Sequence, residues 1–162
     1  LLDRFGMSVE VRTVRDPELR VQVVDQRTGF DADPEAFSVQ VQEVQEALQA
    51  RVVEAQNRLP SVVIDDDLRV RISAVCGELD VDGLRGDIVT NRAARALAAF
   101  EHRNEVTDDD VARVVACCLR HRLRKDPLEQ IDTGDRVIKM FCKVFERPEP
   151  SDRSAFELAL AA

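Results

Sequence analysis

Two arginines lie at positions from which a side chain could reach a phosphate group. Arg4 belongs to the run Leu-Leu-Asp-Arg-Phe-Gly at residues 1–6, and Arg85 follows Gly83 at the start of an alanine-rich helical pattern. The guanidinium fork of arginine binds two phosphate oxygens at once and stays charged. A helix N-terminus attracts anions, whereas cations are normally favoured at the C-terminal end, so the position of Arg85 is unusual.

On position alone, a structural interpretation of these arginines is the simpler one. Arg4 would pair with Asp3 or another surface carboxylate, and Arg85 would be a surface residue offset by Asp82 or Asp87. Arg92 and Arg95, in the same predicted helix, are expected to pack or form ion pairs on its surface. The basic run at residues 120–125 is explained by cations at a helix C-terminus, or alternatively by a contact face between subunits.

Other clusters of reactive residues favour structural roles. Aspartates gather at residues 65–67, 80–82 and 108–110, each at a predicted helix start, where capping explains them. Four cysteines without a CxxC pair, and only two histidines (His102 and His121, both in polar contexts), argue against a zinc site. We expect Cys76, Cys118 and Cys142 to be buried, because each lies on an apolar stripe.

The first half of the chain predicts one strand and two helices. Residues 7–14 alternate apolar and polar, which is the two-residue period of a strand. A lone strand is not stable, so this one must belong to a sheet supplied elsewhere. Asp16-Pro17 begins a short helix that ends at Gly29. Asp33-Pro34 begins a second, whose apolar residues recur every three or four positions until Pro60, predicting a helix of about 25 residues.

The second half predicts a compact set of four helices. The first three are expected to start near residues 65, 84 and 107, and the second of them carries Arg85. The fourth is marked by apolar residues between Ile138 and Phe145. In that second helix we expect one face to be buried: Val89, Ala93, Ala96, Leu97 and Phe100. The buried residues expected in the other three helices are Leu68, Ile72, Val75, Cys76, Leu79, Val111, Val114, Val115, Cys118, Leu119, Ile138, Phe141, Cys142 and Phe145.

Composition agrees with a helical protein and excludes some functions. Charged residues make up 33% of the chain and aromatic residues only 4%. A net charge of −8 argues against nucleic-acid binding, which needs a basic face. No apolar run approaches the roughly 18 residues of a membrane span, so none is expected.

Several strings of residues together resemble the I subunits of magnesium chelatase, a family of AAA+ ATPases. They are the Leu-Leu-Asp-Arg-Phe-Gly run, Ile131-Asp132 and two longer strings. Those are Glu-Leu-Asp-Val-Asp-Gly-Leu-Arg-Gly-Asp-Ile-Val-Thr-Asn-Arg at residues 78–92 and Cys-Leu-Arg-His-Arg-Leu-Arg-Lys-Asp-Pro-Leu-Glu at residues 118–129. The resemblance covers residues 1 to about 145; the tail from Glu146 has no match.

The resemblance implies a mainly α fold, an AAA+ C-terminal helical lid domain with a long linker helix and one strand of the preceding AAA+ sheet. Residues 1–29 would end the α/β core, 30–64 form the linker helix, 65–145 the lid domain and 146–162 a tail. Arg4 would be an arginine finger acting in trans on a neighbour's nucleotide. Arg85 would be the sensor-2 arginine, which binds ATP in cis, and Cys118 is a candidate redox site.

The resemblance also implies a reaction and its partners. A homo-oligomeric ring would hydrolyse ATP with Mg²⁺ and, with D and H subunits, drive Mg²⁺ into protoporphyrin IX for chlorophyll synthesis. The place would be the chloroplast stroma or a bacterial cytoplasm, with no nucleic-acid partner. The alternatives are a MoxR-type AAA+ chaperone and a non-enzymatic helical interaction module.

We expect the 162 residues alone neither to bind ATP tightly nor to hydrolyse it. The chain contains no phosphate-binding loop of the form GxxxxGK[ST] and no apolar strand ending in Asp-Glu to hold magnesium. Isothermal titration calorimetry of the chain with ATP should therefore show no micromolar affinity, and a micromolar dissociation constant would contradict this interpretation.

Overall fold

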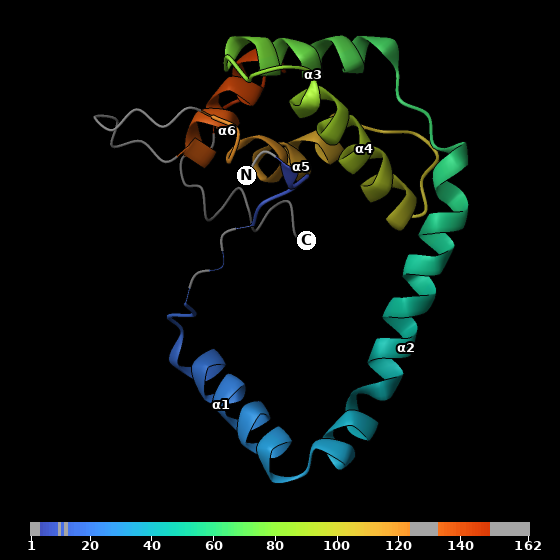
Figure 1. Ribbon diagram of the computed structural model, residues 1–162, viewed down its shortest axis with the longest axis vertical. Coiled ribbons are helices and arrows are strands. Elements are labelled where there is room, and N and C mark those ends of the chain that lie inside the picture. The colour runs from blue at the N-terminus through green and yellow to red at the C-terminus, as the bar shows by residue number, and fades with distance from the viewer. Residues whose placement is uncertain (1–3, 10, 12, 124–132, 150–162) are drawn as a thin grey trace. The chain divides into compact units, whose positions relative to one another are not determined.

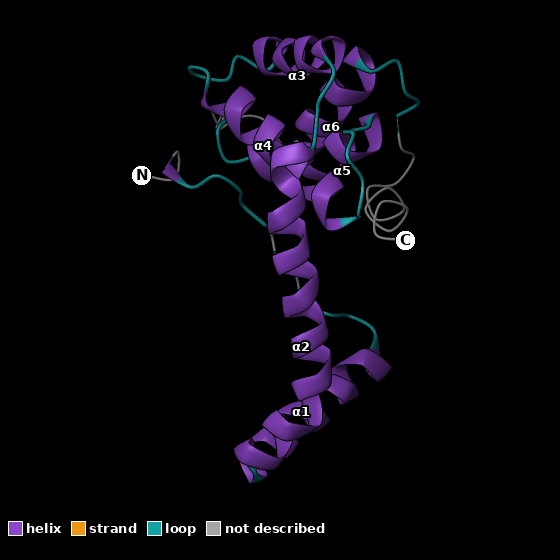
Figure 2. Cartoon of the chain, turned by 90° about the vertical axis from the view of Figure 1, so that its right-hand side faces the viewer, coloured by secondary structure: helices purple, strands orange, loops and turns teal. Residues whose placement is uncertain are grey.

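The computed structural model describes residues 4–9, 11, 13–123 and 133–149, and helices dominate them (Figure 1). No strand is assigned within those ranges (Figure 2). The α-helices are α1 (Pro17–Ala32), α2 (Pro34–Arg58), α3 (Asp66–Glu78), α4 (Arg85–Phe100), α5 (Asp108–Leu119) and α6 (Thr133–Val144), and a 3₁₀ turn, η2, spans Leu59–Ser61. The mainly helical fold expected from the sequence is confirmed.

The chain divides into two units. One comprises Glu10–Glu54 and so contains α1 and most of α2. The other joins the residues up to Val9 to everything from Ala55 onward, and we call it the four-helix unit because α3, α4, α5 and α6 form its core. No described helix is long and apolar enough to cross a membrane.

Helices α1 and α2 begin where their capping residues predict. The Asp16 carboxylate accepts hydrogen bonds from the backbone N–H groups of Glu18 and Leu19, at 2.9 and 3.0 Å. The predicted end at Gly29 is wrong by three residues: Asp33 N–H donates to the Gly29 carbonyl, so the helical ladder runs on through this glycine to Ala32. Helix α2 has 25 residues, as predicted, and corresponds to about 37 Å of helix.

The core of the four-helix unit lies between α3, α4, α5 and α6, and the buried faces predicted for α3, α5 and α6 are confirmed. All fourteen side chains expected to be buried on these three helices and at their ends are buried. Phe141 and Phe145 stack with their ring centroids 4.2 Å apart, and Phe141, Ile72 and Leu119 are among the largest fully buried side chains.

The predicted buried face of α4 is wrong by one residue. Its buried residues are Gly86, Thr90, Ala94, Ala98 and Ala99. Of the residues predicted to be buried, Ala96 is exposed, and Val89, Ala93, Leu97 and Phe100 are half-buried. The physical reason is size. Small residues on the inner face let α4 pack closely against α5 and α3, and the larger apolar residues then fill the margins.

We expect two glycine-to-alanine substitutions in the four-helix unit to have opposite effects. A Cβ added at Gly86 would lie 3.0 Å from both Leu119 Cδ2 and Val81 Cγ1, so Gly86→Ala should lower the free energy of unfolding by about 1–2 kcal/mol. A Cβ added at Gly77 in α3 meets nothing within 4 Å, so Gly77→Ala should raise it by up to about 1 kcal/mol. Denaturant titration measures both free energies of unfolding. If the two substitutions change stability in the same direction, then close packing around Gly86 does not restrict the size of the residue there.

The strand predicted over residues 7–14 is not formed in the described part of that stretch, residues 7–9, 11, 13 and 14. A strand needs a ladder of backbone hydrogen bonds to a neighbour, and no described residue supplies one. Instead, Ser8 N–H donates to the Cys117 carbonyl at 2.8 Å, which attaches this segment to the end of α5. Val9 and Val11 remain 70% and 91% exposed.

Candidate functional site

Arg85 is the first residue of α4 and is exposed to solvent. The preceding turn contains Gly83 at φ +69°, a left-handed conformation that glycine adopts without strain. Leu84 occupies the N-cap position and offers no side-chain acceptor to the first N–H groups of α4. The exposed guanidinium therefore lies at a helix start that its N-cap side chain does not cap, an arrangement that favours an anion.

The finger segment, which we define as Arg4, Phe5 and Gly6, lies against this helix start. Arg85 Nη2 donates to the Arg4 carbonyl at 3.4 Å, a long hydrogen bond. The Arg4 side chain itself is exposed. The two arginines singled out from the sequence are thus neighbours in the four-helix unit, although 81 residues separate them in the chain.

The end of α5 holds the finger segment from a second direction. Arg122 Nη2 donates to the Phe5 carbonyl at 2.7 Å, and His121 Nε2 lies 3.1 Å from the same oxygen. Sequence reasoning missed these two residues, because it treated the basic run at 120–125 only as a group of helix-end cations or a subunit contact. Arg122 Nε does donate to the Cys118 carbonyl at 3.0 Å, as the first of those interpretations predicts. Residues 124 and 125 lie outside the described residues.

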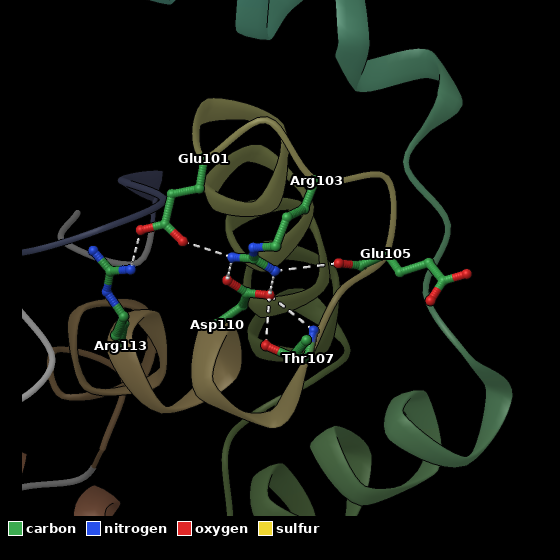
Figure 3. Close-up of polar contacts among 6 residues, drawn as sticks. All are labelled: Glu101, Arg103, Glu105, Thr107, Asp110 and Arg113. Atoms are coloured by element: carbon green, nitrogen blue, oxygen red, sulfur yellow. Dashed lines mark hydrogen bonds and ion pairs between the residues drawn. The ribbon is translucent and has the colours of Figure 1, made fainter.

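A network of charged side chains fixes the other end of α4 to the start of α5 (Figure 3). The Arg103 guanidinium forms a two-point contact with the Asp110 carboxylate, whose Nη1–Oδ2 distance is 2.7 Å. Arg103 also pairs with Glu101 at 2.6 Å, and Glu101 in turn contacts Arg113. Asp110 completes a capping box by accepting a hydrogen bond from Thr107 N–H at 2.8 Å. The network therefore fixes the direction of the helix that carries Arg85.

The electrostatics of this network keep its carboxylates ionised. Burial by itself would raise the pKa of Asp110, which is only 1% exposed, but the hydrogen bonds from Arg103 and Thr107 outweigh it and lower that pKa. The pKa of Glu101 is lowered in the same way: burial opposes the shift, and hydrogen bonds from Arg103 and Arg113 dominate. These ionised groups are consequently structural.

The other two arginines of α4, Arg92 and Arg95, differ in their contacts and exposure. Arg95 donates to the backbone carbonyls of Val62 and Leu59, at 3.1 and 3.2 Å, and so ties α4 to η2, in agreement with the structural role expected of it. Arg92 is exposed and lines a groove of about 800 Å³ between α3 and α4, which Arg85 does not line. The groove nevertheless reaches Leu84, the residue immediately before Arg85.

The aspartate clusters are capping groups at two of the three positions. Asp65 caps α3 by accepting from Asp67 N–H at 3.2 Å, and Asp110 caps α5. The third cluster, at 80–82, instead lies in the turn before α4, where Asp80 adopts φ +52°. Among the described residues, no group of three or more acidic, histidine or cysteine side chains could hold a metal ion.

Cys76, Cys118 and Cys142 are buried, as predicted, and Cys117 is half-buried. Burial raises the pKa of the Cys118 thiol to about 12, so almost none of it is thiolate at neutral pH. The candidate redox role of Cys118 remains a prediction, and it would require local opening of the four-helix unit.

The start of the predicted tail is attached to α5. Arg147 donates to Asp109 at 2.7 Å. Residues 150–162 of the tail lie outside the described ranges.

Comparison with known proteins agrees with this geometry. The AAA lid domain model matches residues 69–140. Magnesium-chelatase subunit ChlI of Synechocystis sp. is 68% identical over 145 residues, which are 90% of this chain and 41% of the relative. The ChlI proteins of Anabaena variabilis and Cyanophora paradoxa are 62% and 60% identical over 90% of the chain. The chain spans about two-fifths of the length of these curated relatives.

A solved structure supports the fold. The crystal structure of a candidate ATPase from Cytophaga hutchinsonii superimposes with a TM-score of 0.62 over 93% of this chain and 48% of its own, at 18% identity. Helices α3 to α6 lie in the region that the AAA lid domain model matches, and the fold class expected from the sequence is confirmed. Within that class, the chain matches the C-terminal portion of magnesium-chelatase I subunits, and the resemblance seen in the sequence is confirmed.

Proposed function

We propose that the full-length protein is an ATP-hydrolysing AAA+ subunit that drives insertion of Mg²⁺ into protoporphyrin IX. The observation that carries the proposal is the pairing of an exposed Arg4 with an exposed Arg85 at a helix start, in a chain 68% identical to a magnesium-chelatase subunit. Identity at this level over 90% of the chain favours this function over a MoxR-type chaperone and over a non-enzymatic helical module.

The two arginines would serve two different nucleotides. Arg85, fixed at the start of α4, would bind the terminal phosphate of the ATP held by its own subunit. Arg4 would act as an arginine finger on the ATP of the neighbouring subunit, where it would stabilise charge on the transferring phosphoryl group. The exposure of both guanidinium groups supports this division, because each must reach a ligand outside the four-helix unit.

ATP and its accompanying Mg²⁺ would be bound only in part by this chain. Arg85 and the N-terminus of α4 fit an anion, and so they fit a phosphate. The Mg²⁺ that accompanies ATP would be held mainly outside the 162 residues, which contain no phosphate-binding loop. The Mg²⁺ inserted into the porphyrin is a substrate.

The proposed partners follow from the finger and from the relatives. A finger acting in trans requires neighbouring copies, which supports a homo-oligomeric ring, working with the D and H subunits of magnesium chelatase. The relatives come from cyanobacteria and plastid-bearing organisms, so the proposed location is a bacterial cytoplasm or the chloroplast stroma.

A chimeric subunit tests the proposed function. The matching 145-residue segment of the Synechocystis subunit is replaced by that of this chain, and Mg²⁺ insertion into protoporphyrin IX is measured with the D and H subunits and ATP. We expect chelation and ATP hydrolysis within a few-fold of the parent subunit. A chimera that folds and hydrolyses ATP but never supports chelation would contradict the proposal.

A further inference from the structure

We propose that His121 and Arg122 are positioning residues for the arginine finger, which they orient through the backbone carbonyls of the finger segment. The inference rests on the role proposed for Arg4. It adds two residues, at the end of α5, that never touch the nucleotide but set the direction in which the finger projects.

Arg122 links the end of α5 directly to the finger segment. Its Nε donates to the Cys118 carbonyl at 3.0 Å, which fixes the base of the guanidinium to the last turn of the helix. Its Nη2 donates to the Phe5 carbonyl at 2.7 Å and approaches the Gly6 carbonyl at 3.4 Å. Because a guanidinium is planar, holding one side fixes where the other side binds.

Two further contacts complete the attachment. His121 Nε2 lies 3.1 Å from the Phe5 carbonyl, and since a carbonyl oxygen only accepts, this nitrogen must carry the proton. The Phe5 oxygen has two lone pairs and can accept from His121 and Arg122 together. Ser8 N–H donates to the Cys117 carbonyl at 2.8 Å, so the segment is held on both sides of Gly6 and cannot slide along α5.

This attachment matters because the Arg4 side chain is exposed, so its direction is set by the backbone that precedes and follows it. A finger stabilises the transferring phosphate only from hydrogen-bond distance. A displacement of about 1 Å in such a group costs up to about 10²-fold in rate. A donor that fixes the Phe5 carbonyl, one residue after Arg4, therefore controls the rate without contacting the substrate.

The test compares three variants of the full-length protein. Arg122→Met removes every donor at similar length, and Arg122→Lys retains a single donor. Arg69→Met removes an exposed arginine that pairs with Asp66, one turn earlier in α3. We expect Arg122→Met to lower kcat for ATP hydrolysis by up to about 10²-fold, with the dissociation constant for ATP unchanged. Arg122→Lys should lose less, and Arg69→Met should match the wild type. Wild-type kcat in Arg122→Met would overturn the proposal.

Mixed rings separate positioning of the finger from damage to the lid. When Arg122→Met is mixed with a subunit whose phosphate-binding loop is disabled, that partner brings an intact finger to the variant's own nucleotide, so hydrolysis should partly return. No recovery would mean that Arg122 acts on its own subunit's site or on folding, and would overturn the proposal.

A readout without ATPase activity distinguishes this inference from the proposed function. Amide hydrogen exchange in the peptide covering residues 5–9 should be faster in Arg122→Met than in the wild type or in Arg69→Met. Unchanged exchange overturns the attachment whatever Arg4 does. If exchange becomes faster but Arg4→Ala hydrolyses ATP normally, then the attachment is confirmed and the finger role proposed for Arg4 is wrong. The positioning role proposed for His121 and Arg122 is then wrong as well.

Discussion

Replacing Arg4 by alanine in the full-length protein should leave ATP binding intact and lower kcat for hydrolysis by about 10³-fold or more. An arginine finger is worth roughly 10³–10⁵ in rate, because it stabilises charge that develops only in the transition state. Arg4 is exposed and held by its backbone, so truncating its side chain should leave the fold unchanged. Steady-state kinetics and equilibrium binding of ATP measure the two quantities.

Mixing experiments should separate Arg4 from Arg85. A subunit with a disabled phosphate-binding loop still has a finger, so it should restore part of the hydrolysis of Arg4→Ala. It should restore none to Arg85→Ala, because Arg85 is proposed to serve the nucleotide of its own subunit. In that mixed ring every subunit has a defect in its own nucleotide pocket, so no intact pocket remains. Equal recovery of the two variants would show that this division of roles is wrong.

Replacing Asp110 by asparagine should lower the free energy of unfolding of the four-helix unit by about 3 kcal/mol at neutral pH. The carboxylate is buried, and its loss leaves Arg103 without its main partner; breaking a fully buried pair costs about 3–5 kcal/mol. We take the lower end because Arg103 is 35% exposed. Asp109→Asn is the matched control: its carboxylate is 68% exposed and pairs with Arg147, so the change should cost less than about 1 kcal/mol.

The cost of Asp110→Asn should depend on pH. The pKa of Asp110 is lower in the folded chain than in the unfolded chain, so its carboxylate contributes stability above the unfolded pKa and loses it as the pH falls through the folded pKa. The difference between wild type and variant should therefore be largest near neutrality and shrink in acid. A difference that stays constant from neutral to strongly acidic pH would show that the charge of Asp110 is not what stabilises the unit.

Local patterns in the sequence were sufficient to predict most of the fold. Capping residues such as Asp16 and Asp65 mark helix starts because their side chains bind backbone groups two or three residues away. The buried faces of α3, α5 and α6 follow from large apolar residues at helical spacing. The same reasoning gave the wrong buried face for α4. The inner face of that helix consists of Gly86, Thr90 and alanines, and a search for large apolar residues does not find them.

The candidate site could be predicted only in part. Arg85 could be singled out by its position after Gly83 at a helix start, and Arg4 by the family resemblance. Their proximity, and the contacts of His121 and Arg122 with Phe5, join residues that are 81 to 117 positions apart in the chain. In these contacts the acceptors are backbone carbonyls, which every residue has. The side chains at residues 4–6 therefore give no pattern from which the contacts could be predicted.

None of the residues of α1 and α2 is buried, and this affects how the chain melts. Helices of 16 and 25 residues with no fully buried side chain depend largely on their own helical propensity. They should therefore lose structure gradually and below the temperature at which the four-helix unit melts. Circular dichroism would then record two overlapping transitions and no single melting temperature. The chain has no tryptophan or tyrosine to report on the core, so a tryptophan introduced at Phe141 would give the four-helix unit a transition of its own.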